Sequence, residues 1–481
     1  MIASGLHGDV SERIRASHLD LSKEDWQLRE MALERPELRS RATFALLDEP
    51  SDLLKYRLQS WPTFVSRGRS QELGRVSVEV SQLVRGVLKR VFDNDAERIA
   101  RFFAVADPTM VDLLLQAPDG IADALSRGDF IRGEEGWKCI EFNIVPTLGG
   151  WDSGHLTDLH LSIPATRRIL EEIGSEVASV NTMRELSKHL RDRARAARLD
   201  GGGEINVAIV TGPTNVNIKR IDVFEAYLRS EYRAVAEAEG ASGGEVFVCN
   251  WSDLTLDAES RLSHGGRRIH AVVELYKGQT EQRVYRSAKS GEVHLYNGPV
   301  SRLLSDKRNL ALLSDEEAGG DYSADERRAI EAYIPWTRLV RRESTRYRGE
   351  RIFLPRFLEQ RREDLVLKSA VQFGGKDVSI GAFTAPEEWS AVVKRALADG
   401  RWVAQERVVS RPYLYQNGDD GCSPHDMIWG PFVFGDRPAG CVLRMQPAAD
   451  LSVVNLSLTA TQGIVFEVPD SPDAHVSPES A

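Results

Sequence analysis

Residues 126–145 constrain the fold more than any other part of the chain. They read SRGDFIRGEEGWKCIEFNIV, two alternating runs on either side of a Gly-Glu-Glu-Gly turn. A hairpin that closes at this turn places Asp129 opposite Glu141 and Arg127 opposite Asn143. Because side chains alternate along a strand, these four polar side chains are expected to project from one face of the hairpin.

The opposite face of this hairpin is expected to pack against a core. It would carry four apolar residues: Phe130, Ile140, Phe142 and Ile144. A slip of one residue would move Asp129 to the wrong face, so the interpretation depends on register. Two carboxylates and an amide oxygen at one point suit Mg²⁺, and a neighbouring arginine can hold a phosphate. A solvated hairpin face with Arg–Asp pairs is the alternative.

Residues 364–381, DLVLKSAVQFGGKDVSIG, predict a strand, a loop and a second strand. Lys368 ends the first strand, and Gly374, Gly375 and Lys376 form the turn. Glycines let backbone N–H groups approach a phosphate, and the lysines would neutralise its charge. The first glycine of a Walker A loop is missing, and no GxGxxG fingerprint occurs. An ordinary hairpin with a Gly-Gly turn explains the segment equally well.

A third segment, residues 401–415, reads RWVAQERVVSRPYLY. Alternation places Gln405 and Arg407 on one face and Glu406 and Val408 on the other. Such a strand could present backbone groups to an adenine edge, and it could equally be any half-buried strand.

The rest of the chain predicts an α/β (α+β) protein. The first hundred residues are mainly helical in pattern, and residues 205–276 read as a β-α-β-β passage with parallel-sheet character. Short strands dominate from residue 351 onward. The last dozen residues are polar and rich in Pro and Ser, so we expect them to be disordered.

Composition excludes several classes of protein. The 481 residues carry 62 basic and 72 acidic side chains, a net charge of -10, which argues against a nucleic-acid-coating surface. The four cysteines are far apart and form no CxxC, so we expect free thiols and no zinc site. No apolar run approaches the roughly 18 residues that span a bilayer. We therefore expect a cytoplasmic protein that binds neither nucleic acid nor membrane.

Together these segments resemble the circularly permuted branch of the ATP-grasp superfamily, which includes glutathionylspermidine synthetases and pheganomycin-type peptide ligases. The Glu-x-Asn pair at 141–143 precedes the lysine and glycine loop, the reverse of the order in ordinary ATP-grasp enzymes. Arg-x-Asp at 127–129, followed by Glu-x-Asn, fits the spacing of this branch. The resemblance covers roughly residues 120–468, and the serine after Lys368 departs from the commoner Lys-Pro opening.

The resemblance implies roles for individual residues. Mg²⁺ would be bound by Asp129, Glu141 and Asn143. Arg127 would contact the γ-phosphate or acyl phosphate, and Arg444 would be the catalytic arginine of a C-terminal strand. ATP would be bound by Lys307, Lys368, Gln372, Gly374, Gly375, Lys376, Gln405, Glu406 and Val408.

The implied activity is that of an ATP-dependent carboxylate–amine ligase. It would join a small carboxylate, such as an amino acid or peptide, to an amine through an acyl phosphate, with natural-product biosynthesis as one setting. A non-catalytic nucleotide-binding scaffold or partner protein, and a kinase-like member that stops at phosphoryl transfer, stay open, as does a homodimer. The expected parts are a helical region (1–110), a metal hairpin with connecting helices (111–200), an α/β acceptor domain (201–345), an ATP lid and nucleotide lobe (346–468) and a tail (469–481).

Overall fold

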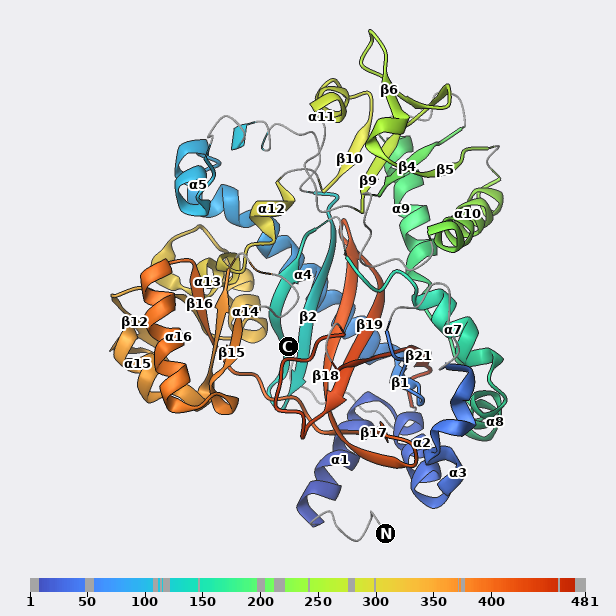
Figure 1. Cartoon of the computed structure of the whole chain (residues 1–481), viewed down its shortest axis with the longest axis vertical. Coiled ribbons are helices and arrows are strands. Elements are labelled where there is room, and N and C mark those ends of the chain that lie inside the picture. Colours follow the sequence, from blue (N-terminus) through green and yellow to red (C-terminus); the bar gives the residue numbers. More distant parts are fainter. Residues whose placement is uncertain are drawn as a thin grey trace.

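The computed structural model places two smaller lobes around one central sheet (Figure 1). The described residues are 8–47, 56–106, 111–112, 115, 122–145, 148–196, 204–211, 221–240, 243–275, 282–297, 300–370, 372, 377–456 and 459–471. Gly374, Gly375 and Lys376 of the expected lid loop lie outside these ranges, as does nearly all of the tail that we expected to be disordered.

The central sheet joins strands from distant parts of the chain. Its order is β20-β19-β18-β2-β3, all antiparallel, and β17 also pairs with β18. The strands are β2 Leu125–Gly133, β3 Gly136–Asn143, β17 Tyr413–Asn417, β18 Gly421–Phe434, β19 Arg437–Pro447 and β20 Thr461–Gly463. The expected hairpin is therefore completed by strands that lie almost three hundred residues later in the sequence.

The register of the β2–β3 hairpin agrees with the sequence analysis at its polar positions. Asp129 pairs with Glu141, and Arg127 pairs with Asn143. A β-bulge follows, because Phe130 pairs with Cys139 and leaves Ile140 as the extra residue of β3. The expectation that Ile140 faces the core is therefore wrong. Cys139 takes that buried position, and Ile140 is only half-buried.

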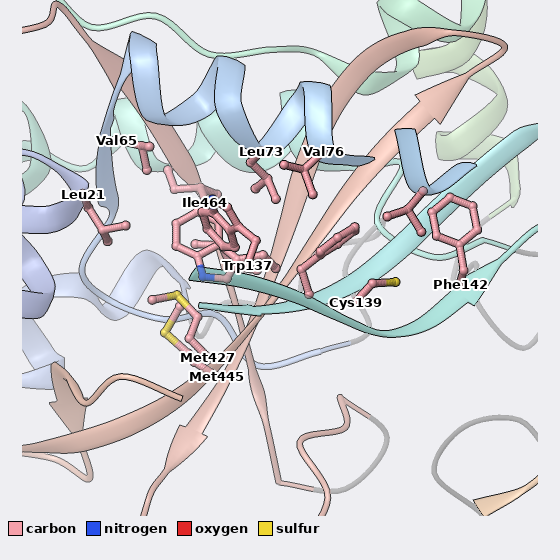
Figure 2. Close-up of a cluster of buried hydrophobic side chains, with 14 of the residues drawn as sticks. Leu21, Val65, Leu73, Val76, Trp137, Cys139, Phe142, Met427, Met445 and Ile464 are labelled. Atoms are coloured by element: carbon pink, nitrogen blue, oxygen red, sulfur yellow. The ribbon is translucent and has the colours of Figure 1, made fainter. Parts of the chain in front are cut away.

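Helix α4 (Arg67–Phe92) covers the apolar face of the central sheet. The helix begins after Ser66, whose hydroxyl accepts from the backbone N–H of Arg69, and it ends at Asp93 in the left-handed conformation. Its apolar side chains pack against residues of both the hairpin and the C-terminal strands, and Figure 2 shows Leu73 and Val76 above Trp137 and Cys139. This core fixes the sheet and leaves the polar face of the hairpin for other contacts.

The first hundred residues are mainly helical, as expected. They form α1 Gly8–Leu21, α2 Lys23–Glu34, α3 Pro36–Arg39, the 3₁₀ helix η1 Arg41–Leu47, α4 and α5 Ala96–Phe103. One short strand, β1 Thr63–Ser66, pairs in parallel with β21 Val465–Val468 near the C-terminus. No helix within the described ranges is both long and apolar enough to cross a membrane. The four cysteines are free thiols.

The α/β lobe contains a parallel sheet of order β10-β9-β4-β5, which confirms the expected parallel character (Figure 1). It is connected to the central sheet by a set of helices. The elements of these helices and of the lobe are α7 Ser153–Ser162, α8 Pro164–Ile173, α9 Thr182–Ala196, β4 Val207–Val210, α10 Ile221–Ala238, β5 Val246–Cys249, η2 Trp251–Asp253, β6 Leu254–Leu256, β7 Leu262–His264, β8 Arg267–Arg268, β9 Ala271–Glu274, α11 Gln282–Lys289 and β10 His294–Tyr296. The elements that follow lie against α4, β3, one another or the strand that comes next in the chain: α12 Ser301–Leu304, α13 Arg308–Ser314, η3 Glu316–Ala318 and α14 Ala324–Tyr333.

The lobe at the left of Figure 1 carries the expected lid strands in an antiparallel sheet of order β11-β16-β14-β15. Its elements are β11 Thr337–Leu339, β12 Ser344–Tyr347, β13 Glu350–Phe353, α15 Leu354–Gln360, η4 Arg362–Asp364, β14 Leu365–Ser369, β15 Val378–Ile380, η5 Gly381–Phe383, α16 Pro386–Asp399 and β16 Trp402–Glu406. Short strands dominate the chain from residue 351 onward, as expected, and the helices α15 and α16 lie among them. Both begin with proline in the first turn, and Trp389 of α16 is fully buried against the sheet.

Candidate functional site

Three charged side chains meet on the polar face of the central sheet. Asp129 of β2 forms ion pairs with two arginines: Nη2 of Arg444 lies 2.5 Å from its Oδ1, and Nε of Arg127 lies 3.4 Å from the same atom. Arg127 also donates from Nη1 to the backbone oxygen of Gly149 at 2.7 Å. The exposed fractions of these side chains are 9% for Asp129 and 13% for each arginine, so the pairs are largely removed from water.

Gly430 of β18 makes room for this arrangement. A Cβ atom at Gly430 would lie 3.1 Å from Cδ of Arg127 and 2.8 Å from Cγ1 of Val442. Both distances are tighter than ordinary van der Waals contact, so a side chain here would displace Arg127. The glycine therefore leaves the space that Arg127 occupies beside Asp129.

A second set of charged side chains surrounds Glu141 of β3. Nζ of Lys307, which precedes α13, lies 3.4 Å from Oε1 of Glu141 and donates to the backbone oxygen of Gln372 at 2.6 Å. Nζ of Lys368 donates to the backbone oxygen of Ile140 at 2.9 Å and to Oε1 of Gln405 at 2.7 Å. The bulge at Ile140 thus presents a carbonyl to the lysine of the lid lobe, and the two sheets meet at this point.

Burial and neighbouring charges shift the pKa values in this cluster. Burial would raise the pKa of Asp129, but Arg444 and Arg127 outweigh it, so the pKa lies below its usual range. Burial lowers the pKa of Lys368 to about 8, against the opposing effect of Glu141. Burial also lowers the pKa of Arg127, although Asp129 partly compensates. The carboxylate is therefore ionised at neutral pH, and Lys368 is the group whose charge is most easily lost.

Positive charge exceeds negative charge in the cluster. Arg127, Arg444, Lys307 and Lys368 supply four positive charges, and Asp129 and Glu141 supply two negative ones, which leaves a net charge of +2. Nε of Arg444 is buried without a hydrogen-bond partner among the described residues. Buried charges are costly unless they are compensated, so this arrangement favours an anionic ligand.

The structure brings most of the sequence-predicted residues to this place, but not all. Gln372 contributes its backbone oxygen, and its side chain is exposed. The carboxylate of Glu406 is turned toward the lid lobe, where it accepts from the hydroxyl of Tyr347 and from Arg348, both at 2.9 Å. Val408 lies against the closed end of the hairpin, with Cγ1 3.7 Å from a Cβ built on Gly133.

Two contributors were missed by the sequence analysis. Gly430 had no local signal, because its function depends on a side chain from another strand. Thr337, in the Pro-Trp-Thr-Arg segment, accepts from Nε2 of Gln405 at 3.1 Å and so orients the amide that holds Lys368.

The oxygen ligands expected for a metal are Asp129, Glu141 and Asn143. The described part of the chain holds no group of three or more His, Cys, Asp or Glu side chains placed around one metal position. The expected set holds only two carboxylates, and each is ion-paired with a cation of the site. The side chains lie on one face by register, and both oxygen types suit a hard divalent cation, so the donor set fits Mg²⁺.

No protein-family model matches the chain, and no curated protein matches it in sequence. Solved structures do match, 45 chains in all. A glutathione synthetase-like effector from Globodera pallida, solved in its apo form, matches with a TM-score of 0.53 and 12% identity over 90% of this chain and 98% of that chain. A candidate gamma-glutamylcysteine synthetase from Methylobacillus flagellatus KT gives a TM-score of 0.38 and 10% identity over 84% of this chain and 92% of that chain. The first likeness shows that the chain has a synthetase-like fold, and the second is too low to support an argument.

Proposed function

We propose that the chain is an ATP-dependent ligase that joins a carboxylate to an amine. The observation that carries the proposal is the excess of buried positive charge between the hairpin and the lid lobe, which suits a polyphosphate. The synthetase-like fold of the effector from Globodera pallida supports the same class of reaction.

More specifically, we propose that the chain is a circularly permuted ATP-grasp enzyme. The hairpin with Asp129 and Glu141 comes early in the chain, and Lys368 comes late, yet Lys368 donates to the bulge of that hairpin. This contact supports a nucleotide site between β3 and the lid sheet. We also propose the division into a helical region, a metal hairpin, an α/β acceptor domain and an ATP lid at the boundaries given above.

Each charged residue has a part in the proposed reaction. Lys307 and Lys368 would bind the phosphates, while Arg127 and Arg444 would stabilise charge on the transferred phosphoryl group and on the acyl phosphate. Asp129, Glu141 and Asn143 would hold Mg²⁺, which when bound supplies neutralisation of the phosphate oxygens. Gln405 would keep Lys368 oriented through its hydrogen bond at 2.7 Å.

The reaction needs no enzyme nucleophile. A carboxylate oxygen of the substrate attacks the γ-phosphorus, the bond to the β-γ bridging oxygen breaks, and ADP leaves. The amine then attacks the acyl carbon, loses a proton, and phosphate leaves. Positioning and exclusion of water are the protein's contribution. We propose an amino acid or peptide as the carboxylate substrate and a small amine as the acceptor.

The test is release of ADP and phosphate in the presence of paired carboxylate and amine substrates. Turnover that requires both partners supports the ligase. ADP release with the carboxylate alone indicates a kinase-like protein, and ATP binding without turnover across a broad amino acid and peptide screen indicates a non-catalytic binding protein. Glu141→Ala should abolish Mg²⁺-dependent turnover, whereas the matched Glu135→Ala, an exposed change in the same hairpin turn, should keep it.

A further inference from the structure

A carboxylate outside the charged cluster lies on the same face of the central sheet. Asp426 belongs to β18, and its side chain shares a face with Ile428 and Gly430 because strand side chains alternate. Ile428 pairs with Arg444, and Asp426 pairs with the next residue of that face, Gln446. Asp426 therefore continues the polar face that begins at the arginines.

The segment that leaves the lid lobe passes beside Asp426. The backbone N–H of Met427 donates to Oγ of Ser410 at 3.3 Å. At the closed end of the hairpin, a Cβ built on Gly133 would lie 3.3 Å from the backbone oxygen of Val409. Residues 406–411 thus run between the closed end of the hairpin and the middle of β18, next to Asp426.

The two ends of this face are separated by a length that suits an extended nucleotide. Asp129 and Gly133 are four residues apart on β2, which corresponds to about 13 Å along a strand. The cations lie at the Asp129 end, and the linker with Val408 lies at the Gly133 end. A nucleoside triphosphate with its phosphates on the cations would carry its nucleoside toward the linker and Asp426.

The carboxylate of Asp426 has room for hydrogen-bond donors. It is half-buried, and it forms no hydrogen bond or ion pair with another residue of the described ranges. The charge of Arg407 acts on it, and the guanidinium of Arg407 lies over Phe383 at 4.8 Å from the ring centre. Burial raises the pKa of Asp426, and Arg407 opposes this shift only partly. A hydrogen-bond donor from a ligand would therefore stabilise this carboxyl group, which lacks a partner within the described ranges.

We propose that Asp426 accepts hydrogen bonds from the ribose hydroxyl groups of the bound nucleotide. A carboxylate has two acceptor oxygens, and neighbouring hydroxyl groups can donate to both. The inference rests on the proposed function, because it requires a nucleotide whose phosphates occupy the cation cluster. It adds a group that distinguishes ribonucleotides from deoxyribonucleotides.

The test compares binding of ATP, 2′-deoxyATP and 3′-deoxyATP by titration calorimetry in three proteins. The wild type should bind ATP at least about tenfold more tightly than one of the deoxy nucleotides, because a hydrogen bond to a charged group is lost. Asp426→Ala should bind ATP more weakly and lose the preference. Asp420→Ala, an exposed change in the β17–β18 turn, should keep it.

Each result has a defined meaning. An unchanged preference in Asp426→Ala overturns the ribose assignment while leaving ATP binding, and thus the proposed function, intact. In the ligase assay, a rise of only the KM for the amine in Asp426→Ala would also overturn the ribose assignment, because Asp426 would then bind the amine substrate. Failure of the wild type to bind any of the three nucleotides overturns both proposals. Asp426→Asn keeps one acceptor oxygen and a similar shape, so it should restore part of the preference even if the alanine variant is unstable.

Discussion

Asp129→Asn removes one buried negative charge and leaves the shape of the side chain nearly unchanged. Arg127 and Arg444 would then face a neutral amide from distances of 3.4 and 2.5 Å. Removing one member of a buried ion pair typically costs about 3–5 kcal/mol. Because the exposed fractions of these side chains are 9–13%, we expect the free energy of unfolding to fall by about 3 kcal/mol, the lower end of this range.

This loss should be visible in thermal unfolding. An unfolding entropy of about 2.1 cal/mol/K per residue gives about 1 kcal/mol/K for the 481 residues, so Tm should fall by about 3 °C. A polyanion should reverse part of the loss, because its charge replaces that of Asp129 beside the arginines. Tripolyphosphate without a divalent cation should therefore raise the Tm of Asp129→Asn more than that of the wild type.

Asp152→Asn is the matched control. Oδ1 of Asp152 accepts from Nε2 of Gln462 at 3.0 Å, a bond that asparagine can keep, and burial raises the pKa of this carboxyl group. Loss of its charge should therefore leave Tm unchanged or slightly higher. Differential scanning calorimetry at neutral pH measures the Tm of both variants and of the wild type. Equal Tm values for Asp129→Asn and the wild type, or an equal loss in both variants, would refute the charge argument.

Three further predictions use different groups. The affinity for ATP, measured by titration calorimetry, should fall as pH rises through about 8, because Lys368 loses its charge there. Lys368→Arg should remove this pH dependence, and a wild-type affinity that does not change with pH would contradict a role of Lys368 in binding phosphate. Burial lowers the pKa of His160 to about 3 and that of His189 and His425 to about 4, so these groups are neutral in the folded protein and protonate on unfolding near pH 6.5. Stability should therefore be full above about pH 6.5 and decrease below it by up to about 1.4 kcal/mol per pH unit for each group, and Tm values that stay constant down to pH 5 would count against this. His18→Ala should cost about 2–5 kcal/mol in urea unfolding without changing nucleotide affinity, because His18 links Asp25 at 2.6 Å to the backbone N–H of Leu414 at 2.8 Å and both contacts would be lost.

The hairpin shows how far the sequence could predict the site. Alternation and a short turn determine which residues of β2 and β3 are opposite, and the pairs Asp129–Glu141 and Arg127–Asn143 follow from those two features alone. The bulge at Ile140 could not be read in the same way. It exchanges Ile140 for Cys139 on the core face, and strand alternation alone does not predict where an extra residue is inserted.

Local sequence patterns could not predict the contacts between distant strands. The short distance from Arg444 to Asp129 requires that β19 and β2 flank β18, and Arg127 has its place beside them because residue 430 of β18 lacks a side chain. Neither condition leaves a periodic signal. The helix α16, in contrast, does carry a local signal. Proline stands in its first turn, and its buried residues recur at helical spacing: Trp389, Val392, Val393 and Ala396.

The charge balance of the site connects the ion pairs of the free protein with the proposed function. The six charged side chains sum to +2, and ATP with one magnesium ion carries about -2 at neutral pH, so the complex would be neutral in a place where water is scarce. Without a nucleotide, each carboxylate is satisfied by a cation of the same cluster. With a nucleotide bound as proposed, the arginines and lysines would gain phosphate oxygens as partners, and Asp129 and Glu141 would become available to the metal. The ion pairs of the free protein would then exchange partners on binding, which is why substitutions at Asp129 should affect stability and nucleotide response in opposite directions.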